Sequence, residues 1–254
     1  MFDGIAGQWV PVLCSEQLGV EPRTVTVASE RLVVRRDAEG RAAAVVDLHQ
    51  IGDAARAIPL PAVEAGGFVF VFTDRRGAGP PPALEEPAGE RARRVETWAM
   101  PWTEVMERLL VQPQRSLQRD SATARRLSAW LRAETPTVVT TLRGVAVRWG
   151  SGELGVAQLD WVRPHGIELR TGWGGEDEDL LRLWCVPIDL HRTRVFVDRA
   201  ELTDETGPPS AIDTTATAPT EELVLRFRRW QLRYGSSSRA APPIDTGAVV
   251  RALR

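Results

Sequence analysis

Cysteine and histidine, which hold most protein-bound transition metals, are scarce in this sequence. The 254 residues include only 2 Cys and 3 His. These residues are Cys14, Cys185, His49, His165 and His191. They form none of the short-spaced pairs, such as C-x2-C or H-x3-H, that zinc sites use, and iron–sulfur clusters need four such ligands. The sequence therefore argues against a zinc or iron–sulfur centre, and we expect no metal and no cofactor.

Long apolar runs and a large excess of one charge are also absent. No apolar stretch approaches the roughly 20 residues that a membrane-spanning helix needs. Residues Met1 to Gly7 lack the basic and apolar regions of a secretory signal. The net charge of -2 is not the basic footprint of a nucleic-acid-binding protein. We therefore expect a cytoplasmic protein that binds neither nucleic acid nor a membrane.

Tryptophan, by contrast, is abundant, with 9 Trp against 1 Tyr. Tryptophan is large and amphipathic, so a high content indicates either a demanding core or an aromatic-lined cavity for an apolar small molecule. Composition alone leaves both interpretations open.

Residues 1–74 predict a small all-β domain. Short β-branched segments alternate with turns, and one turn is Asp37-Ala38-Glu39-Gly40. The continuous apolar segment Phe68–Phe72 is typical of a buried strand. Residues 75–94 carry Pro and Gly among charged residues without periodicity, which predicts a linker.

Residues 95–254 predict a second domain, which makes the chain α+β. Helices are expected at Trp102–Leu110 and Glu221–Tyr234, because each segment places its apolar residues on one stripe. Between them, a series of β-rich segments separated by turns predicts an antiparallel meander. These segments are 137–149, 154–163, 167–173, 180–188 and 194–202. Such a sheet, curved around the long C-terminal helix, leaves a central cavity between sheet and helix.

The order of six segments along the chain carries a resemblance to a known family. The segments are Trp9–Val12, Leu32–Arg41, Gly67–Phe72, Trp102–Glu107, Leu159–Pro164 and Val186–Phe196. In this order they resemble the alpha subunits of Rieske-type non-haem iron oxygenases over most of the chain. The resemblance implies a Rieske-like β domain followed by a helix-grip domain of the START type. It also implies a homo-oligomer, such as a trimer.

The metal-binding residues of that family have no counterpart here. The family carries C-x-H and C-x-x-H in two loops of its first domain, whereas this chain has no Cys between Cys14 and Cys185. In the segment that resembles the iron-binding helix, Val111 stands where the family has Asp, and Gln114 and Arg119 stand where it has His. Glutamine is a poor iron ligand and arginine is a cation. The resemblance therefore implies an oxygenase scaffold that lacks both centres and does not act as an oxygenase.

Strand alternation indicates which residues face the expected cavity. In the segment 137–149, Val139, Val145, Val147 and Trp149 form the more apolar face. The same argument makes Trp149, Trp161 and Trp173 point the same way, whereas Trp184 is ambiguous because both faces of its strand are apolar.

Two groups of candidate site residues follow. We expect Gln114, Gln118 and Arg119 to act as catalytic hydrogen-bond donors to a carbonyl or enolate. We expect the substrate to contact Val111, Trp149, Trp161, Thr171, Trp173 and Trp184. Two alternatives stay open: the tryptophans fill the core, and the three polar residues pair with one another.

The remaining reactive residues give no recognisable catalytic set. His165 and His191 fall in predicted turns and are expected to be exposed to solvent. Cys185 falls in a predicted strand and is expected to behave as a small buried apolar residue.

A metal-free pocket of this kind predicts a cofactor-independent cyclase that acts on an apolar, polyketide-type intermediate. A [4+2] cycloaddition of the Diels–Alder type suits it, because holding a flexible chain in the reactive conformation is most of what the reaction needs. One alternative is a non-catalytic small-molecule-binding protein or an inactive partner subunit of an oxygenase. Another is a cofactor-free isomerase or dehydratase that uses a carboxylate such as Asp198.

Overall fold

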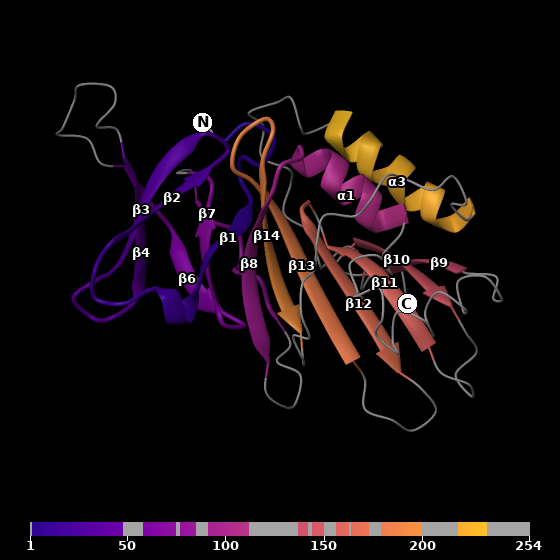
Figure 1. Cartoon of the computed structure of the whole chain (residues 1–254), viewed down its shortest axis with the longest axis horizontal. Coiled ribbons are helices and arrows are strands. Elements are labelled where there is room, and N and C mark those ends of the chain that lie inside the picture. Colours follow the sequence, from indigo (N-terminus) through magenta and orange to yellow (C-terminus); the bar gives the residue numbers. More distant parts are fainter. Residues whose placement is uncertain are drawn as a thin grey trace.

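The computed structural model shows a chain built mainly of antiparallel β-sheets (Figure 1). It describes residues 2–47, 58–74, 77–84, 91–111, 137–141, 144–149, 156–162, 164–172, 179–199 and 218–232. Within these residues there are three sheets and two α-helices. The chain is therefore α+β, as the sequence predicts.

Two small sheets form the N-terminal part of the chain. The four-stranded sheet has the order β2 (Arg23–Val27), β3 (Glu30–Arg36), β4 (Ala42–Val46) and β5 (Ile58–Leu60). The three-stranded sheet has the order β1 (Trp9–Cys14), β7 (Phe68–Phe72) and β6 (Ala62–Ala65). All five residues of β7 are buried, which confirms the buried strand that its continuous apolar run predicts.

The turn between β3 and β4 follows from its sequence. The carboxylate of Asp37 accepts hydrogen bonds from the backbone N–H groups of Glu39, at 3.0 Å, and of Arg41, at 2.8 Å. Gly40 has a φ angle of 79°, a left-handed conformation that glycine adopts without steric cost. The predicted hairpin turn is confirmed.

A seven-stranded sheet forms the second part of the chain, and both helices lie on one of its faces (Figure 1). The helices are α1 (Trp102–Val111) and α3 (Ala218–Trp230). The strands, in spatial order, are β8 (Ala92–Trp98), β14 (Thr193–Arg199), β13 (Asp179–Pro187), β12 (Gly166–Gly172), β11 (Val156–Val162), β10 (Gly144–Trp149) and β9 (Thr137–Thr141).

Two details of this sheet differ from the sequence-based expectation. The edge strand β8 begins at Ala92, inside the segment 75–94 predicted as a linker. The segment 137–149 forms two paired strands instead of one, with Ala146 opposite Val139. Val139 therefore shares the face of Ala146 and not that of Val145, because directly paired residues point to the same side of a sheet.

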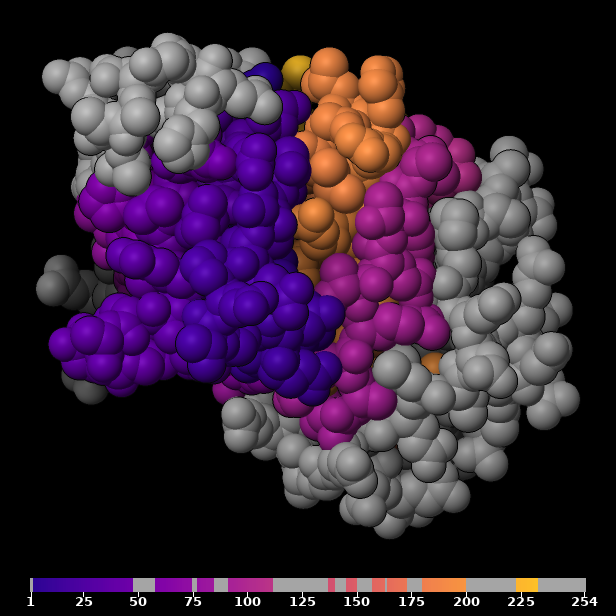
Figure 2. Space-filling model, turned by 60° about the vertical axis from the view of Figure 1, so that its left-hand side comes forward, coloured from indigo at the N-terminus to yellow at the C-terminus, as the bar shows by residue number. Residues whose placement is uncertain are grey.

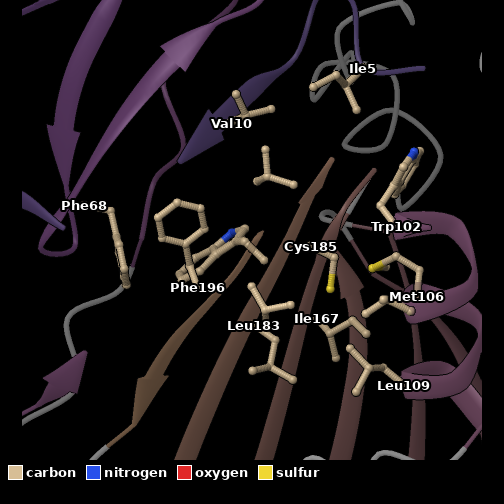
Figure 3. Packing of buried hydrophobic residues seen from close by; sticks show 14 of the residues in the cluster. Ile5, Val10, Phe68, Trp102, Met106, Leu109, Ile167, Leu183, Cys185 and Phe196 are labelled. Atoms are coloured by element: carbon tan, nitrogen blue, oxygen red, sulfur yellow. The ribbon is translucent and has the colours of Figure 1, made fainter. Parts of the chain in front are cut away.

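The N-terminal sheets pack directly against the seven-stranded sheet. The ring of Phe68 lies 4.9 Å from that of Trp184 and 5.9 Å from that of Phe196, edge to face in both cases (Figure 3). At the β2–β3 turn, the backbone N–H groups of Ala28 and Ser29 donate to the carbonyls of Pro187 and Ile188, both at 2.7 Å. Figure 2 shows residues 2–47, in indigo, against the orange β14 and the magenta region that contains β8.

Candidate functional site

The face of the seven-stranded sheet that carries the helices is almost entirely apolar, and we call it the helix-facing side. Trp161 identifies it, because its ring lies 5.6 Å from that of Phe227 and 6.5 Å from that of Trp230, both in α3. Figure 3 shows Cys185 and Ile167 on the same side, beside α1. Strand pairing gives the other members: Val145, Val147, Trp149, Ala157, Leu159, Leu169, Thr171, Leu181, Leu183, Val195 and Val197.

Three predicted substrate-contacting residues lie on the helix-facing side. Trp149 pairs with Ala157, which pairs with Thr171, so these residues share a face with Trp161. Trp149 is 0% exposed and Trp161 is 1% exposed. The prediction that the two tryptophans point the same way is confirmed. Val111 ends α1 and packs, partly buried, against the same core.

Trp184 lies on the opposite face of the sheet. Its ring contacts Phe68 at 4.9 Å and Phe70 at 6.0 Å, both in the N-terminal three-stranded sheet. The sequence could not decide its direction, since the residues on either side of Trp184 in β13 are apolar too. Because the sheet separates Trp184 from Trp149 and Trp161, we exclude it from the candidate site.

Four other predicted site residues, Gln114, Gln118, Arg119 and Trp173, lie outside the described residues. Their roles as hydrogen-bond donors and as a substrate contact stay predictions.

Arg199 is a site residue that the sequence reasoning missed. Asp198 pairs with Arg182 on the opposite face, so Arg199, the next residue of β14, projects to the helix-facing side. It is 7% exposed, and its Nε atom makes no hydrogen bond to any residue that the structure describes. The alternation in β14 is the signal that could have revealed it, since every second residue, Val195, Val197 and Arg199, points to the same face.

Arg94 and Glu96 bring further charge to the same side, at the β8 edge. They pair with Val197 and Val195 respectively. An Nη2 atom of Arg94 lies 2.6 Å from Oε1 of Glu96, and the indole N–H of Trp98 donates to Oε2 of Glu96 at 2.8 Å. The helix-facing side is thus apolar over its centre and charged at one edge.

His165 is buried, contrary to the prediction that its turn exposes it. The residue is 3% exposed, and its Nδ1 atom has no hydrogen-bond partner within the described part of the chain. Burial lowers the pKa of its imidazole to about 3, because a charged ring would lose its hydration. Its backbone carbonyl accepts a hydrogen bond from the N–H of Cys185 at 2.8 Å, so the turn packs into the fold. Cys185 is buried as predicted.

Charged residues line the opposite face of the sheet. Arg182 forms ion pairs with Glu168 and Asp198. Its Nε atom lies 3.1 Å from Oε1 of Glu168, and its Nη1 atom lies 3.5 Å from Oδ2 of Asp198. The Nε atom of Arg91 donates to Asp198 at 3.0 Å, and Arg93 lies 3.6 Å from the same carboxylate oxygen. Asp198 is therefore held in ion pairs and separated from the helix-facing side by the sheet.

Comparison with known proteins identifies the fold. No family model and no curated protein matches the sequence. Among solved structures, a mutant of Pseudomonas putida CBB5 NdmA with caffeine has a TM-score of 0.62 at 11% identity, covering 94% of this chain and 96% of that one. Dicamba monooxygenase bound to dicamba has a TM-score of 0.56 at 13% identity, covering 99% and 90%. This chain has the fold of Rieske-type oxygenase alpha subunits.

A third structure of this fold is the oxygenase of carbazole 1,9a-dioxygenase, solved with carbazole and ferredoxin. It has a TM-score of 0.52 at 17% identity, covering 90% of this chain and 76% of that one. The predicted resemblance to Rieske-type oxygenases is therefore confirmed at the level of the fold.

The two cysteines do not fit the iron–sulfur cluster that the Rieske-type fold implies. Cys14 pairs with Phe68 and Cys185 faces α1, so the seven-stranded sheet separates their thiols. Burial is the main cause that raises the pKa of Cys14 to about 11, and burial also raises that of Cys185. Both thiols are thus protonated at neutral pH, whereas cluster ligation requires thiolates.

The described residues also offer no site for the catalytic iron of this fold. They contain no group of three or more His, Cys, Asp or Glu side chains that could hold a metal ion. Val111, which the resemblance matches to a ligand, has an alkyl side chain with no donor atom. A search of the same residues for a helix long and apolar enough to cross a membrane finds none.

Proposed function

We propose that this chain is a cofactor-independent cyclase that binds an apolar, polyketide-type intermediate between the seven-stranded sheet and helices α1 and α3. One observation carries the proposal. The chain has a Rieske-type fold with a buried aromatic surface on the helix-facing side, around Trp149 and Trp161. By the sequence resemblance, Val111, Gln114 and Arg119 stand where that family has metal ligands.

The helix-facing side supports binding of an apolar substrate. Ligand pockets are typically lined by hydrophobic and aromatic side chains with a few polar groups. Trp149, Trp161 and Thr171 supply that combination, and the Nε1 atom of Trp149 is buried without a hydrogen-bond partner among the residues described. We place the substrate against these residues, in a pocket of helix-grip type that α1 and α3 close.

An intramolecular [4+2] cycloaddition is the ring closure that suits such a pocket. Six π electrons rearrange, two carbon–carbon σ bonds form, and the product is an isomer of the substrate. The reaction needs no oxidant, reductant or leaving group. Holding the chain in its reactive conformation lowers the barrier by up to about 7–11 kcal/mol in ideal cases. Gln114, Gln118 and Arg119 would add to this by donating hydrogen bonds to a carbonyl of the alkene partner.

The rival enzymatic role, an isomerase or dehydratase using Asp198, is less well supported. Its carboxylate is engaged by Arg91, Arg93 and Arg182 on the opposite face of the sheet. The sheet also separates this carboxylate from the helix-facing side, where we place the substrate. A non-catalytic binding protein remains the alternative that the following experiment addresses.

The test uses purified protein dialysed against EDTA and a synthetic linear polyene in which a tether joins a diene to an activated alkene. We expect faster formation of a product of unchanged mass than in buffer, followed by chromatography with mass detection. The variant Gln114→Ala should slow the reaction. Its matched control is Gln158→Ala, because Gln158 bonds to Arg148 and Asp160 on the opposite face.

Each alternative has its own outcome in this experiment. Saturable binding without acceleration would support the carrier and contradict the cyclase. Acceleration that EDTA dialysis abolishes would contradict a cofactor-independent reaction. Equal rates for the Gln114→Ala and Gln158→Ala variants would remove Gln114 from the site.

A further inference from the structure

Two guanidinium groups meet at the β8–β14 edge of the helix-facing side. Arg94 pairs with Val197, two residues before Arg199 on the same face of β14. Diagonal neighbours on adjacent antiparallel strands lie about 7–8 Å apart. The two arginines therefore project side by side from adjacent strands to the helix-facing side of the sheet.

Two positive charges, of Arg94 and Arg199, and one negative charge, of Glu96, lie at this edge of the helix-facing side. Glu96 is engaged by Arg94 at 2.6 Å and by the indole N–H of Trp98. The Nε atom of Arg199 is buried and has no hydrogen-bond partner among the described residues, and the residue as a whole is 7% exposed. Burying a donor of a charged guanidinium group is costly unless an acceptor accompanies it. The described residues thus leave the buried Nε–H donor of Arg199 without an acceptor.

We infer that Arg199, with Arg94 beside it, forms an anion-binding site that holds the carboxylate or enolate oxygen of an otherwise apolar substrate. The planar fork of a guanidinium group suits two oxygens at once. The neighbouring residues of the same face, Val195 and Val197, are buried and apolar, so the rest of the ligand must be apolar too. This inference rests on the proposed function, because that proposal places the substrate on this side.

The substrate class is therefore an amphiphile, with an anionic oxygen group at one end and an apolar body. Thr171 lies on the central strand β12, and Trp149 lies toward the opposite edge on β10, four strands away from β14. At about 4.8 Å per strand this corresponds to roughly 19 Å along the sheet. An extended ligand whose anionic end binds Arg199 can therefore place its apolar part against the tryptophans.

The test compares two fluorescent probes that share one apolar framework. The anionic probe is 1-anilinonaphthalene-8-sulfonate, and the neutral probe is N-phenyl-1-naphthylamine. We expect Arg199→Gln to weaken binding of the anionic probe about tenfold, as for loss of one charged hydrogen bond. Binding of the neutral probe should not change. The matched control is Arg23→Gln, because Arg23 is exposed on β2, and it should leave both probes unaffected.

Folding is controlled by the urea midpoint of each variant and by a second substitution. Arg199→Lys keeps the charge, so it should retain part of the preference for the anionic probe even if Arg199→Gln does not fold. Equal weakening of both probes in Arg199→Gln would overturn the inference, since it would assign Arg199 a structural role. Unchanged binding of the anionic probe would overturn it as well.

The same measurement distinguishes failure of the anion site from failure of the proposed function. Wild-type protein that binds neither probe would contradict the proposed apolar pocket itself. Binding of the neutral probe, together with no effect of Arg199→Gln or Arg199→Lys on the anionic probe, would contradict the anion site alone.

Discussion

Arg182 and Asp198 form an ion pair in which each side chain is only 1% exposed, with 3.5 Å between Nη1 and Oδ2. Glu168, on the neighbouring strand β12, accepts a hydrogen bond from Arg182. Arg91 donates a hydrogen bond to the other oxygen of Asp198. The ionic network therefore runs across the face of the sheet opposite the helices. In it the three guanidinium groups of Arg91, Arg93 and Arg182 share the two carboxylates of Asp198 and Glu168, so removing a carboxylate leaves positive charge buried without compensation.

The substitution Asp198→Asn should destabilise the fold by about 3–5 kcal/mol, because Arg182 and Arg91 would lose their counter-charge in a buried place. Urea unfolding followed by circular dichroism measures the loss. The control is Glu39→Gln, since Glu39 pairs with Arg41 at an exposed turn and exposed ion pairs contribute little. If both variants unfold at the same urea concentration as the wild type, the network does not stabilise the fold.

The stability of the protein should fall as pH drops below the pKa of an unfolded histidine, about 6.5. The pKa of buried His165 is lowered to about 3, so between these values the unfolded chain binds a proton that the folded chain does not. The free energy of unfolding is thus highest, with respect to this residue, above pH 6.5 and falls with acidification.

The variant His165→Gln should show this directly. Between pH 7 and pH 5 the wild type should lose about 2 kcal/mol of unfolding free energy that the variant does not lose. The variant should therefore gain that much stability relative to the wild type. His191→Gln is the matched control, because His191 is exposed, and its difference should stay constant. A constant difference for His165→Gln as well would show that this imidazole titrates normally in the folded protein.

The two tryptophans on opposite faces should separate binding from stability. Trp161→Leu is expected to weaken binding of N-phenyl-1-naphthylamine, because Trp161 lies on the helix-facing side against Phe227 and Trp230. Trp184→Leu should lower the urea midpoint, since it removes contacts with Phe68 and Phe70, but should leave the affinity of the folded protein unchanged. If Trp184→Leu weakened binding and Trp161→Leu did not, the binding site would lie on the face opposite the one that we propose.

Protein produced in iron-supplemented medium should contain less than stoichiometric iron by elemental analysis. Dialysis against EDTA should leave its thermal midpoint unchanged, because bound metal would otherwise stabilise the folded state by mass action. One or two iron atoms per chain, or a lowered midpoint after dialysis, would show that residues outside the described part supply ligands.

Much of the fold follows from local sequence pattern. The alternation of apolar and polar residues locates the strands from β10 to β14, and the 3.6-residue period locates α1 and α3. It also predicts that Trp149 and Trp161 point the same way, because each lies on the more apolar face of its own strand and apolar faces turn toward a common core. The order of segments along the chain was enough to indicate the Rieske-type fold, which the comparison with solved structures confirms.

Other features depended on which surfaces meet. The direction of Trp184 was decided by the N-terminal sheet, because both faces of β13 are covered and periodicity cannot rank two apolar faces. His165 sits in a turn, yet the turn is buried, since exposure depends on what packs over it. Val139 faces away from Val145 because the chain forms two paired strands there.

The charged residues show the same division most clearly. The sequence by itself determined that Arg182 and Arg199 fall in strands and that Asp198 and Arg199, as neighbours in one strand, point to opposite faces. Only the tertiary structure decided that Arg182 meets Glu168 and Asp198 while the Nε–H donor of Arg199 is buried without a described acceptor. The physical reason is that a strand sets the side to which a residue points, but its electrostatic partners come from strands distant in sequence.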